Sequence, residues 1–351
     1  MRFRIFIALL VALLLAYVVF WFVLADQAEK KVVAAIDAQR RAGAAIAYDA
    51  LDVRGFPYRL EFAAINLDMA REEPNGVSWR VVSPELVVVL QPWRLTHAIL
   101  FAEDLTATLS EASDSTTLVT RNMRASVVTD EARVPLRIAM ETEHLTASGS
   151  ETGNQVFSAE NVDFHWRRPT GNTMAALAGT PAEGDAVLEP LSSQWAIRGE
   201  RLHHPAFGKS PYGETIQRFM ATLSVRGEPG DRFDRQALAV WRDQGGTLEL
   251  TQLSMAWGAL DLIVEGSVSL DDRFRPLGAF TAQVKGYEAV IDHLQQAGEI
   301  DATEAETVKQ TLRNITSDDE EGRLTIPIAM QSGRLFIGPL PVANLPPVIE
   351  E

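Results

Sequence analysis

Histidines are the first residues in this chain that could do chemistry, because a neutral imidazole binds metal ions and an imidazole exchanges protons near neutral pH. His203 and His204 are adjacent, Pro205 follows them, and His165 lies upstream. Adjacent residues of a strand point to opposite faces of a sheet, so His203 and His204 cannot easily bind one metal ion together. A metal site that includes His165 stays open as an alternative, but the sequence favours ordinary surface or turn histidines.

Motifs for nucleophilic catalysis and phosphate binding are absent from the sequence. It contains no G-x-S-x-G elbow, no H-E-x-x-H and no G-x-G-x-x-G after a predicted strand. Gly208-Lys209-Ser210 resembles the end of a phosphate-binding loop, but position 203, where the first glycine belongs, is histidine. The chain has no cysteine, which excludes thiolate nucleophiles and cysteine-bound metals. We therefore predict no catalytic residue, no cofactor and no enzymatic activity, and a hydrolase with an unrecognised site is the least favoured alternative.

Acidic residues gather at Asp271-Asp272 and in the run of residues 318–321. Carboxylate oxygens are calcium ligands, so both places could attract that ion, although solvated turns are the favoured interpretation. The formal net charge is -15. Such a charge argues against nucleic acid as a partner, because binding to phosphates depends on basic residues.

An apolar run near the N-terminus is the strongest single signal in the sequence. Arg2 and Arg4 precede it, and it extends from Ile5 to Leu24. Roughly 20 helical residues cross a hydrocarbon core of about 30 Å. Residues 1–25 are therefore predicted to be a membrane anchor with a cytoplasmic N-terminus. A cleaved signal peptide ending near residue 25 is the alternative.

A helical stalk is predicted for residues 26–43, with an interfacial helix on the bilayer as its alternative. Strands should begin near Ala45, because apolar and polar residues then alternate. No helix of a dozen residues separates the early strands, which indicates an antiparallel meander. Residues 169–190 are rich in glycine, alanine, threonine and proline, so we predict a flexible loop there. A helix is expected from Asp231, with Phe233, Ala237, Val240 and Trp241 on one stripe.

The C-terminal third combines strands with two short helices. A strand over residues 260–270 and a second one through Phe280 form a predicted hairpin. Just upstream, the apolar residues change parity, which predicts a bulge near Thr251 or Gln252. Helical spacing follows at residues 287–298 and 301–315, where Asp301 and Glu304 have the spacing of a capping box. Strands return at residues 324–330 and 335–337, and the proline-rich end should be irregular.

These patterns predict a mainly β fold of the α+β type. It would be a long antiparallel curved sheet or half-open β-roll with a few short amphipathic helices and one transmembrane helix. We expect residues 44–345 to form a single elongated domain and residues 346–351 to be a tail.

Five stretches resemble a bacterial envelope family catalogued only as domain of unknown function 2125. They are Gly258-Ala-Leu-Asp-Leu with Glu265-Gly266, Pro276-Leu-Gly-Ala-Phe, the tail from Leu324 through Gly333-Arg-Leu-Phe-Ile-Gly-Pro-Leu-Pro, Arg54-Gly-Phe-Pro-Tyr-Arg, and Gln91-Pro-Trp-Arg followed by His97. The resemblance implies a single-pass protein of the bacterial inner membrane with its main domain in the periplasm. It transfers no activity and no catalytic residue. An anchor followed by long amphipathic strands is also similar to AsmA-like proteins, which are thought to hold lipids in a β-groove.

The apolar strand faces need a cover, either from one another or from a ligand. A closed β core and an open groove are both compatible with the sequence. We predict an apolar groove lined by Leu262, Val264, Val268, Phe280, Val284, Ile326, Ile328 and Met330. The predicted function is to bind or conduct an apolar ligand, a lipid, along that groove. The alternative is an envelope scaffold or assembly factor that recruits envelope proteins and has a closed core without a small ligand.

Overall fold

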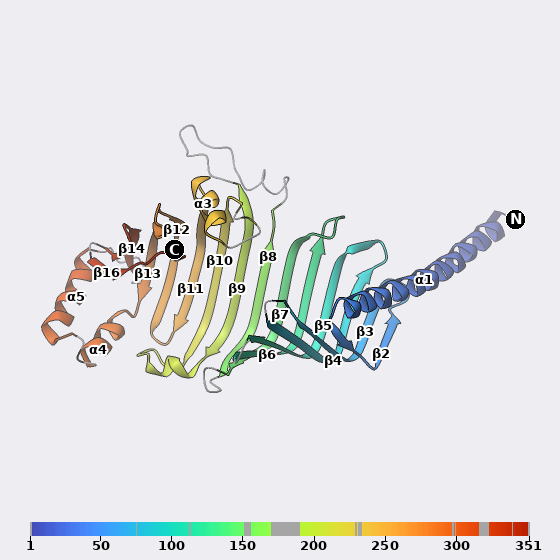
Figure 1. Cartoon of the computed structure of the whole chain (residues 1–351), viewed down its shortest axis with the longest axis horizontal. Coiled ribbons are helices and arrows are strands. Elements are labelled where there is room, and N and C mark those ends of the chain that lie inside the picture. Colours follow the sequence, from blue (N-terminus) through green and yellow to red (C-terminus); the bar gives the residue numbers. More distant parts are fainter. Residues whose placement is uncertain are drawn as a thin grey trace. The chain divides into compact units, whose positions relative to one another are not determined.

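The computed structural model describes residues 2–74, 76–111, 114–150, 156–169, 190–228, 230, 234–296, 298, 300–315, 323–338 and 340–349. Most of the predicted loop at 169–190 and the acidic run at 318–321 lie outside these residues. The chain divides into two compact units (Figure 1). Unit 1 comprises Met1–Pro135 and Met140–Val156, and unit 2 comprises Leu136–Ala139 and Phe157–Glu351. The prediction of a single domain over residues 44–345 stays a prediction.

The strands belong to a 16-stranded sheet whose hydrogen-bonded order follows the sequence from β1 to β16, except that β1 and β2 both pair with β3. The ends of this order do not pair with each other, so the sheet is open. Neighbouring strands are antiparallel, as in the pair β3 and β4 and the pair β12 and β13. The predicted mainly β fold with a long antiparallel sheet is therefore confirmed.

Unit 1 is a meander of long strands. They are β1 (Ala45–Ala47), β2 (Ala50–Arg54), β3 (Leu60–Glu72), β4 (Val77–Gln91), β5 (Arg94–Glu111), β6 (Asp114–Thr129) and most of β7 (Pro135–Gly149). Strand β6 was not predicted from the sequence. Its N-terminal half is rich in Ser and Thr, so the period of apolar residues is weak there, although threonine favours strands.

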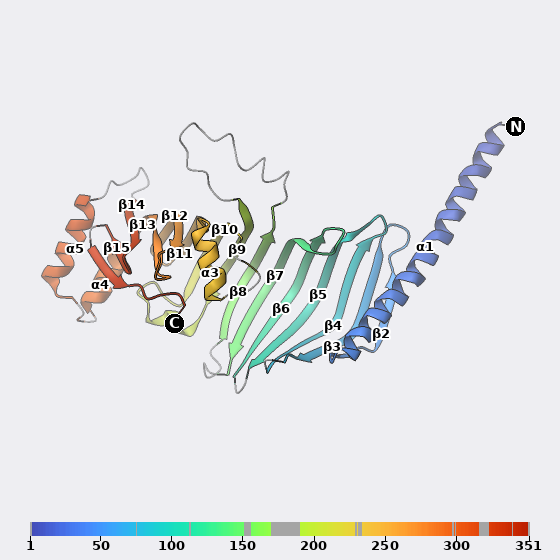
Figure 2. The same ribbon diagram turned by 45° about the horizontal axis from the view of Figure 1, so that its top comes forward.

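Helix α1 (Arg2–Arg41) is continuous, so the predicted stalk follows the apolar run without a break. Its C-terminal half lies on unit 1, where Trp21 and Ala25 are buried against Leu60 and Phe62. Further contacts at helical spacing come from Leu24, Ala28 and Val32. The N-terminal half projects away from the strands (Figures 1 and 2). Its apolar side chains are mostly exposed. By length and composition α1 is a candidate membrane span, and a signal sequence would meet the same criteria.

Unit 2 alternates strands with short helices. Its elements are β8 (Val156–Arg167), β9 (Leu191–His203), the 3-10 helix η1 (Pro205–Lys209), β10 (Thr215–Arg226), α3 (Arg235–Asp243), β11 (Thr247–Trp257), β12 (Leu260–Leu270), β13 (Pro276–Lys285), α4 (Glu288–Gln296), α5 (Ala302–Ile315), β14 (Leu324–Gln331), β15 (Arg334–Ile337) and β16 (Leu340–Asn344). Strand β16 corrects the prediction of an irregular end. It pairs on one side with β15, and an edge strand tolerates Pro341.

Local sequence signals explain the helices of unit 2. The carboxylate of Asp234 accepts a hydrogen bond from the amide of Ala237 and caps α3, so this helix begins at Arg235. The predicted start at residue 231 lies outside the described residues. Its buried residues are Leu238 and Trp241, whereas Val240 is exposed, which corrects the predicted stripe. Residue 233 lies outside the described residues.

The two helices between β13 and β14 match their predictions. The Asp301 carboxylate accepts from the amide of Glu304 at 2.8 Å, and the Asp301 amide donates to the Glu304 carboxylate at 2.9 Å, so the capping box is confirmed. Gly298 follows α4 with a φ of 76°. That left-handed conformation at the end of a helix is the one that glycine adopts most readily.

Candidate functional site

All eight predicted groove residues lie on one face of the sheet in unit 2. Residues directly opposite each other in neighbouring antiparallel strands point to the same face. Leu262 opposes Val284, which opposes Leu324, and Val264 opposes Ala282, which opposes Ile326. The same registers place Phe280 opposite Ile328, and Val268 and Met330 on the two sides of Gly278.

The apolar face extends across strands that the predicted groove did not include. Leu253 opposes Val264 on one side and Ala221 on the other, and Ala221 opposes Ile197. Parallel rows add the following side chains from β8 to β11: Phe164, Trp166, Trp195, Phe219, Leu223, Val225, Leu248, Leu250 and Met255. We name the whole set, from Phe164 on β8 to Met330 on β14, the apolar face. Its extra residues were visible in the sequence as separate alternating strands, but their common face depends on register.

A bulge in β11 keeps that strand in phase with its neighbours. Thr222 pairs with Gln252, and the next residue of β10, Leu223, pairs with Leu250. Thr251 is therefore the extra residue, and the predicted bulge is confirmed. If this same sequence formed a regular strand without the bulge, Leu253 and Met255 would point to the face opposite Leu250.

The apolar face is partly exposed. Trp195 and Ile197 keep 40% and 42% of their surface accessible, although Trp195 packs its ring at 5.9 Å from Phe164. Most of the other apolar side chains of the face are half-buried, and a few, such as Leu324 and Ile326, are buried. Large side chains held side by side with part of their surface in water are a feature typical of interaction surfaces.

An aromatic cluster closes the apolar face where β9 and β11 turn. The ring of Trp257 lies 5.3 Å from that of Phe207 and 5.7 Å from that of Tyr212. The Tyr212 hydroxyl donates to the carbonyl oxygen of Gly286 at 3.1 Å, and the Trp257 ring nitrogen donates to Gly213 at 2.7 Å. Burial raises the pKa of Tyr212, so its hydroxyl stays a hydrogen-bond donor.

A second cluster covers the other end. Leu238 and Trp241 of α3 pack with Phe274 against Leu248 and Leu270. The Trp241 ring nitrogen donates to the carbonyl oxygen of Arg226 at 2.7 Å. Packing leaves no room beside this ring, because a β-carbon on Gly246 would lie 2.3 Å from it. The exposed part of the apolar face thus lies between two fixed aromatic clusters.

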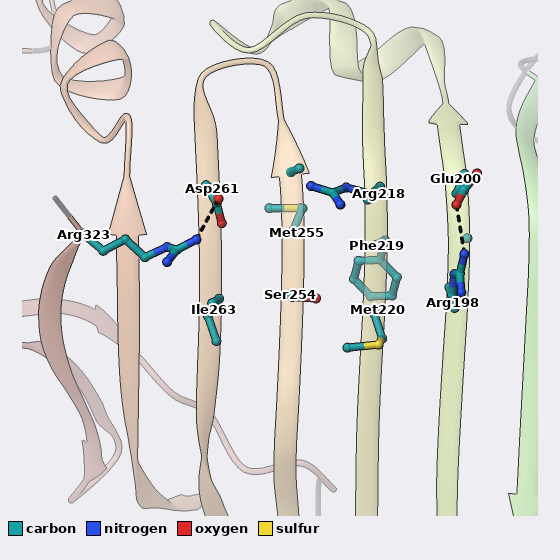
Figure 3. Close-up of a pocket in the computed structure, with 12 residues that line it drawn as sticks. Arg198, Glu200, Arg218, Phe219, Met220, Ser254, Met255, Asp261, Ile263 and Arg323 are labelled. Carbon is teal, nitrogen blue, oxygen red and sulfur yellow. Dashed lines mark hydrogen bonds and ion pairs between the residues drawn. The ribbon is translucent and has the colours of Figure 1, made fainter. Parts of the chain in front are cut away.

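The opposite face of unit 2 is polar and holds a depression of about 480 Å³ (Figure 3). Arg323 reaches across to Asp261 at 3.1 Å, and Arg198 pairs with Glu200 at 3.0 Å. The pKa of Glu200 lies below its ordinary value because the amide of Asn161 and then Arg198 donate to it, and Arg218 adds its charge. Four of these five charged side chains form ion pairs within the protein, and Arg218 adds one further positive charge beside Glu200. We assign no ligand to the depression.

The residues that suggested chemistry do not converge. His165 of β8 opposes Ala196, which lies near the start of β9. His203 is the last residue of β9 and opposes Thr215. The ring of His204 accepts a hydrogen bond from the amide of Ala206 and caps η1. Gly208 and Lys209 belong to this 3-10 helix, which is not the strand–loop–helix context of a phosphate loop. Among the described residues, no group of three His, Asp or Glu could hold a metal ion.

Asp271 forms hydrogen bonds within the turn that contains it. Its carboxylate accepts from the amides of Arg273 at 2.8 Å and Arg275 at 2.9 Å, and from the guanidinium of Arg275 at 2.8 Å. Burial by itself would raise the pKa of Asp271, but these hydrogen bonds outweigh it and hold the pKa below its ordinary value.

Comparisons with known proteins leave the family as the one identification. No curated protein and no solved structure matches the chain. A family model described as "Uncharacterized protein conserved in bacteria" matches residues 21–346, a span that includes the end of the apolar run, both units and the complete apolar face. The chain therefore belongs to this bacterial family, DUF2125.

Proposed function

We propose that this protein is anchored in the bacterial inner membrane by α1 and holds a lipid on the apolar face of unit 2 in the periplasm. The observation that carries the proposal is the apolar face itself, with Trp195 and Ile197 about two-fifths exposed. Its rows are continuous from β8 to β14. An acyl chain laid along them would remove apolar surface from water on both partners, at about 25 cal/mol per Å².

The packing of α1 supports its role as a retained anchor. Trp21 and Ala25 are 3% and 7% exposed, and both contribute to the core with Leu60 and Phe62. Cleavage after residue 25 would remove these two side chains and Leu24 from the core. Exposing that surface opposes folding of a cleaved form, which favours an anchor over a signal peptide.

The test compares two adjacent positions on opposite faces. Ile197 lies on the apolar face and is exposed, whereas Ala196 faces the other way, opposite His165 and Thr222. We expect Ile197→Glu to lose lipid, because a carboxylate in contact with an acyl chain must give up its hydration. Ala196→Glu should retain lipid. The measurement is native mass spectrometry of the full-length variants from membranes, after detergent exchange that strips the lipids around α1.

Two outcomes would contradict lipid binding by unit 2. Equal lipid occupancy in Ile197→Glu and Ala196→Glu would place the lipid around α1 alone. Absence of tightly held lipid from the unaltered protein would remove the ligand altogether. Because Ile197 is exposed, its substitution should leave folding intact, and the circular dichroism of the two variants checks this.

A scaffold that recruits envelope proteins is the second candidate. The observation in its favour is β16, which ends the hydrogen-bonded order of the strands, so a partner strand could add to it. Val342 on this strand is exposed. A photo-crosslinker at position 342 should then capture the same stoichiometric partner in repeated preparations. Ala343→Pro, introduced into the same protein, removes a backbone amide from the edge strand and should abolish the capture.

A further inference from the structure

Two turns of unit 1 lie side by side where α1 leaves the sheet. Residues 55–59 join β2 to β3, and Pro92 and Trp93 join β4 to β5. Leu60 opposes Leu90, so the start of β3 is beside the end of β4 and the two turns are neighbours. In a meander the next turn, at residues 73–76, falls at the opposite ends of the strands (Figure 2).

These two turns expose large apolar side chains. Tyr58 and Trp93 have 72% and 65% of their surface accessible, and Phe56 and Leu95 are also exposed. The described residues of the opposite turn are Glu73, Pro74 and Gly76, which include no large apolar side chain. Single exposed apolar residues are ordinary in soluble proteins, but a group of four, three in adjacent turns and Leu95 at the start of β5, is a candidate contact surface.

The apolar helix contacts one of these turns directly. The Tyr17 hydroxyl donates to the carbonyl oxygen of Pro57 at 2.5 Å. The ring of Phe56 lies 5.4 Å from that of Trp21 and stacks at 5.8 Å on that of Phe22. With a rise of 1.5 Å per residue, Tyr17 lies about 10 Å before Leu24 along the helix axis. The turn is therefore level with the last turns of the apolar run.

We propose that the β2–β3 and β4–β5 turns form a second membrane contact, with Phe56, Tyr58, Trp93 and Leu95 inserted into the interfacial layer of the leaflet from which α1 emerges. The proposal rests on α1 spanning the bilayer, and it does not depend on lipid binding by unit 2. The partner is the surface of the bilayer, because the contacts of α1 hold these turns at the level where its apolar run ends.

The chemistry of the turns suits that layer. Tryptophan and tyrosine are enriched at membrane interfaces, where the ring meets apolar chains and its polar atom meets water or head groups. Arg94 is exposed next to Trp93, where its guanidinium can reach an anionic head group. The β2–β3 turn also contains an internal backbone hydrogen bond, in which the amide of Arg59 donates to the carbonyl oxygen of Gly55 at 3.1 Å.

A fluorescent label can test the depth of these turns, because the chain has no cysteine and a single one can be introduced anywhere. The variants are Tyr58→Cys and Trp93→Cys, with Glu72→Cys at the opposite end of β3 as the matched control. Each full-length protein is labelled with bimane and reconstituted in vesicles of phosphatidylethanolamine and phosphatidylglycerol. Quenching is then measured with a nitroxide carried by the lipid near its head group and with iodide in the water.

The lipid-borne nitroxide should quench the labels at positions 58 and 93 and leave the label at 72 bright. Iodide should quench the label at position 72 and leave the labels at 58 and 93 bright. Equal quenching by iodide at all three positions would overturn the proposal, since the turns would then face water. Protection from both quenchers at 58 and 93 would also overturn it, because a protein or a second copy of the chain would then cover the turns.

Position 95 gives a further label if the Tyr58 variant does not fold, because it lies at the start of β5, beside the other turn. The outcome is distinct from that of the lipid-binding test. Failure of the membrane contact would leave the lipid content of the Ile197 and Ala196 variants unchanged.

Discussion

The hydroxyl group of Tyr17 donates a hydrogen bond to the carbonyl oxygen of Pro57 across 40 positions of sequence. This bond joins a polar atom within the apolar run to a turn of the sheet. A hydroxyl without a partner in an apolar environment costs free energy, so the bond fixes both groups.

Tyr17→Phe should loosen the turn at residues 55–59. We expect a loss of about 0.5–1.5 kcal/mol, because the carbonyl oxygen of Pro57 loses its donor. Hydrogen exchange measured by mass spectrometry on the full-length protein should show faster exchange in the peptide containing Arg59, whose amide donates to Gly55. Tyr48→Phe is the control, because the ring of Tyr48 keeps its place beside Arg40. Unchanged exchange in Tyr17→Phe would count against this role of the bond.

Asp271→Asn should destabilise unit 2 at neutral pH by about 1–3 kcal/mol, since charge-assisted hydrogen bonds to the turn are lost. The neighbouring Asp272 is exposed, so Asp272→Asn is the matched control with little expected effect. Thermal unfolding followed by near-ultraviolet circular dichroism measures both variants.

The contribution of Asp271 should also depend on pH with a defined sign. Its pKa is lowered in the folded state, so the stabilisation is fully present above the unfolded pKa of about 3.9. It is lost as the pH falls through the folded pKa. The difference in unfolding temperature between the unaltered protein and Asp271→Asn should therefore shrink in acid below about pH 4. A difference that grows in acid would contradict the assignment.

Gly246→Ala should disturb the cluster around Trp241. The new β-carbon would lie 2.3 Å from the indole ring, which must move out of its place in the core. Overpacking of this kind costs about 1–3 kcal/mol. Gly208→Ala is the control, because the nearest atoms to its β-carbon belong to the flexible side chain of Glu214. The midpoint of urea unfolding separates the two variants.

Deleting Thr251 should preserve the apolar face. The bulge places Leu250 and Leu253 on the same face, and without Thr251 these two residues keep that relation in a regular strand. Deleting Ser254 instead leaves Leu253 out of phase with Met255 and Trp257. We expect the first variant to keep the tryptophan emission and unfolding temperature of the unaltered protein within a few degrees, and the second to lose several degrees. Equal losses would show that the bulge has another role.

The sequence predicted the local features that depend on period and on short-range hydrogen bonds. The bulge at Thr251 follows from a change of parity, and the capping box at Asp301 follows from a spacing of three residues. Both signals lie within one element, so no knowledge of the neighbouring strands is needed. The groove residues of any one strand share a face for the same reason, whereas the register between β12, β13 and β14 brings the three sets onto one face.

Long-range relationships were missed. The sequence does not show that Trp195 and Ile197 continue the rows of Leu250 and Leu253, because the register between strands sets this. Nor does the sequence show that Trp21, which belongs to the apolar run, packs in one cluster with Phe62 of the sheet. A tryptophan near the end of a membrane helix is ordinary at an interface, and only the folded sheet shows what its ring contacts.

Because helix α1 is unbroken, a tilt of its N-terminal half would also tilt unit 1. The C-terminal half of α1 is attached to the sheet through Trp21, Leu24 and Val32. The N-terminal half spans the bilayer in our proposal. A helix accommodates a thinner hydrocarbon layer by tilting. Since no hinge separates the two halves, a change in bilayer thickness would be converted into an angle of the strands relative to the membrane.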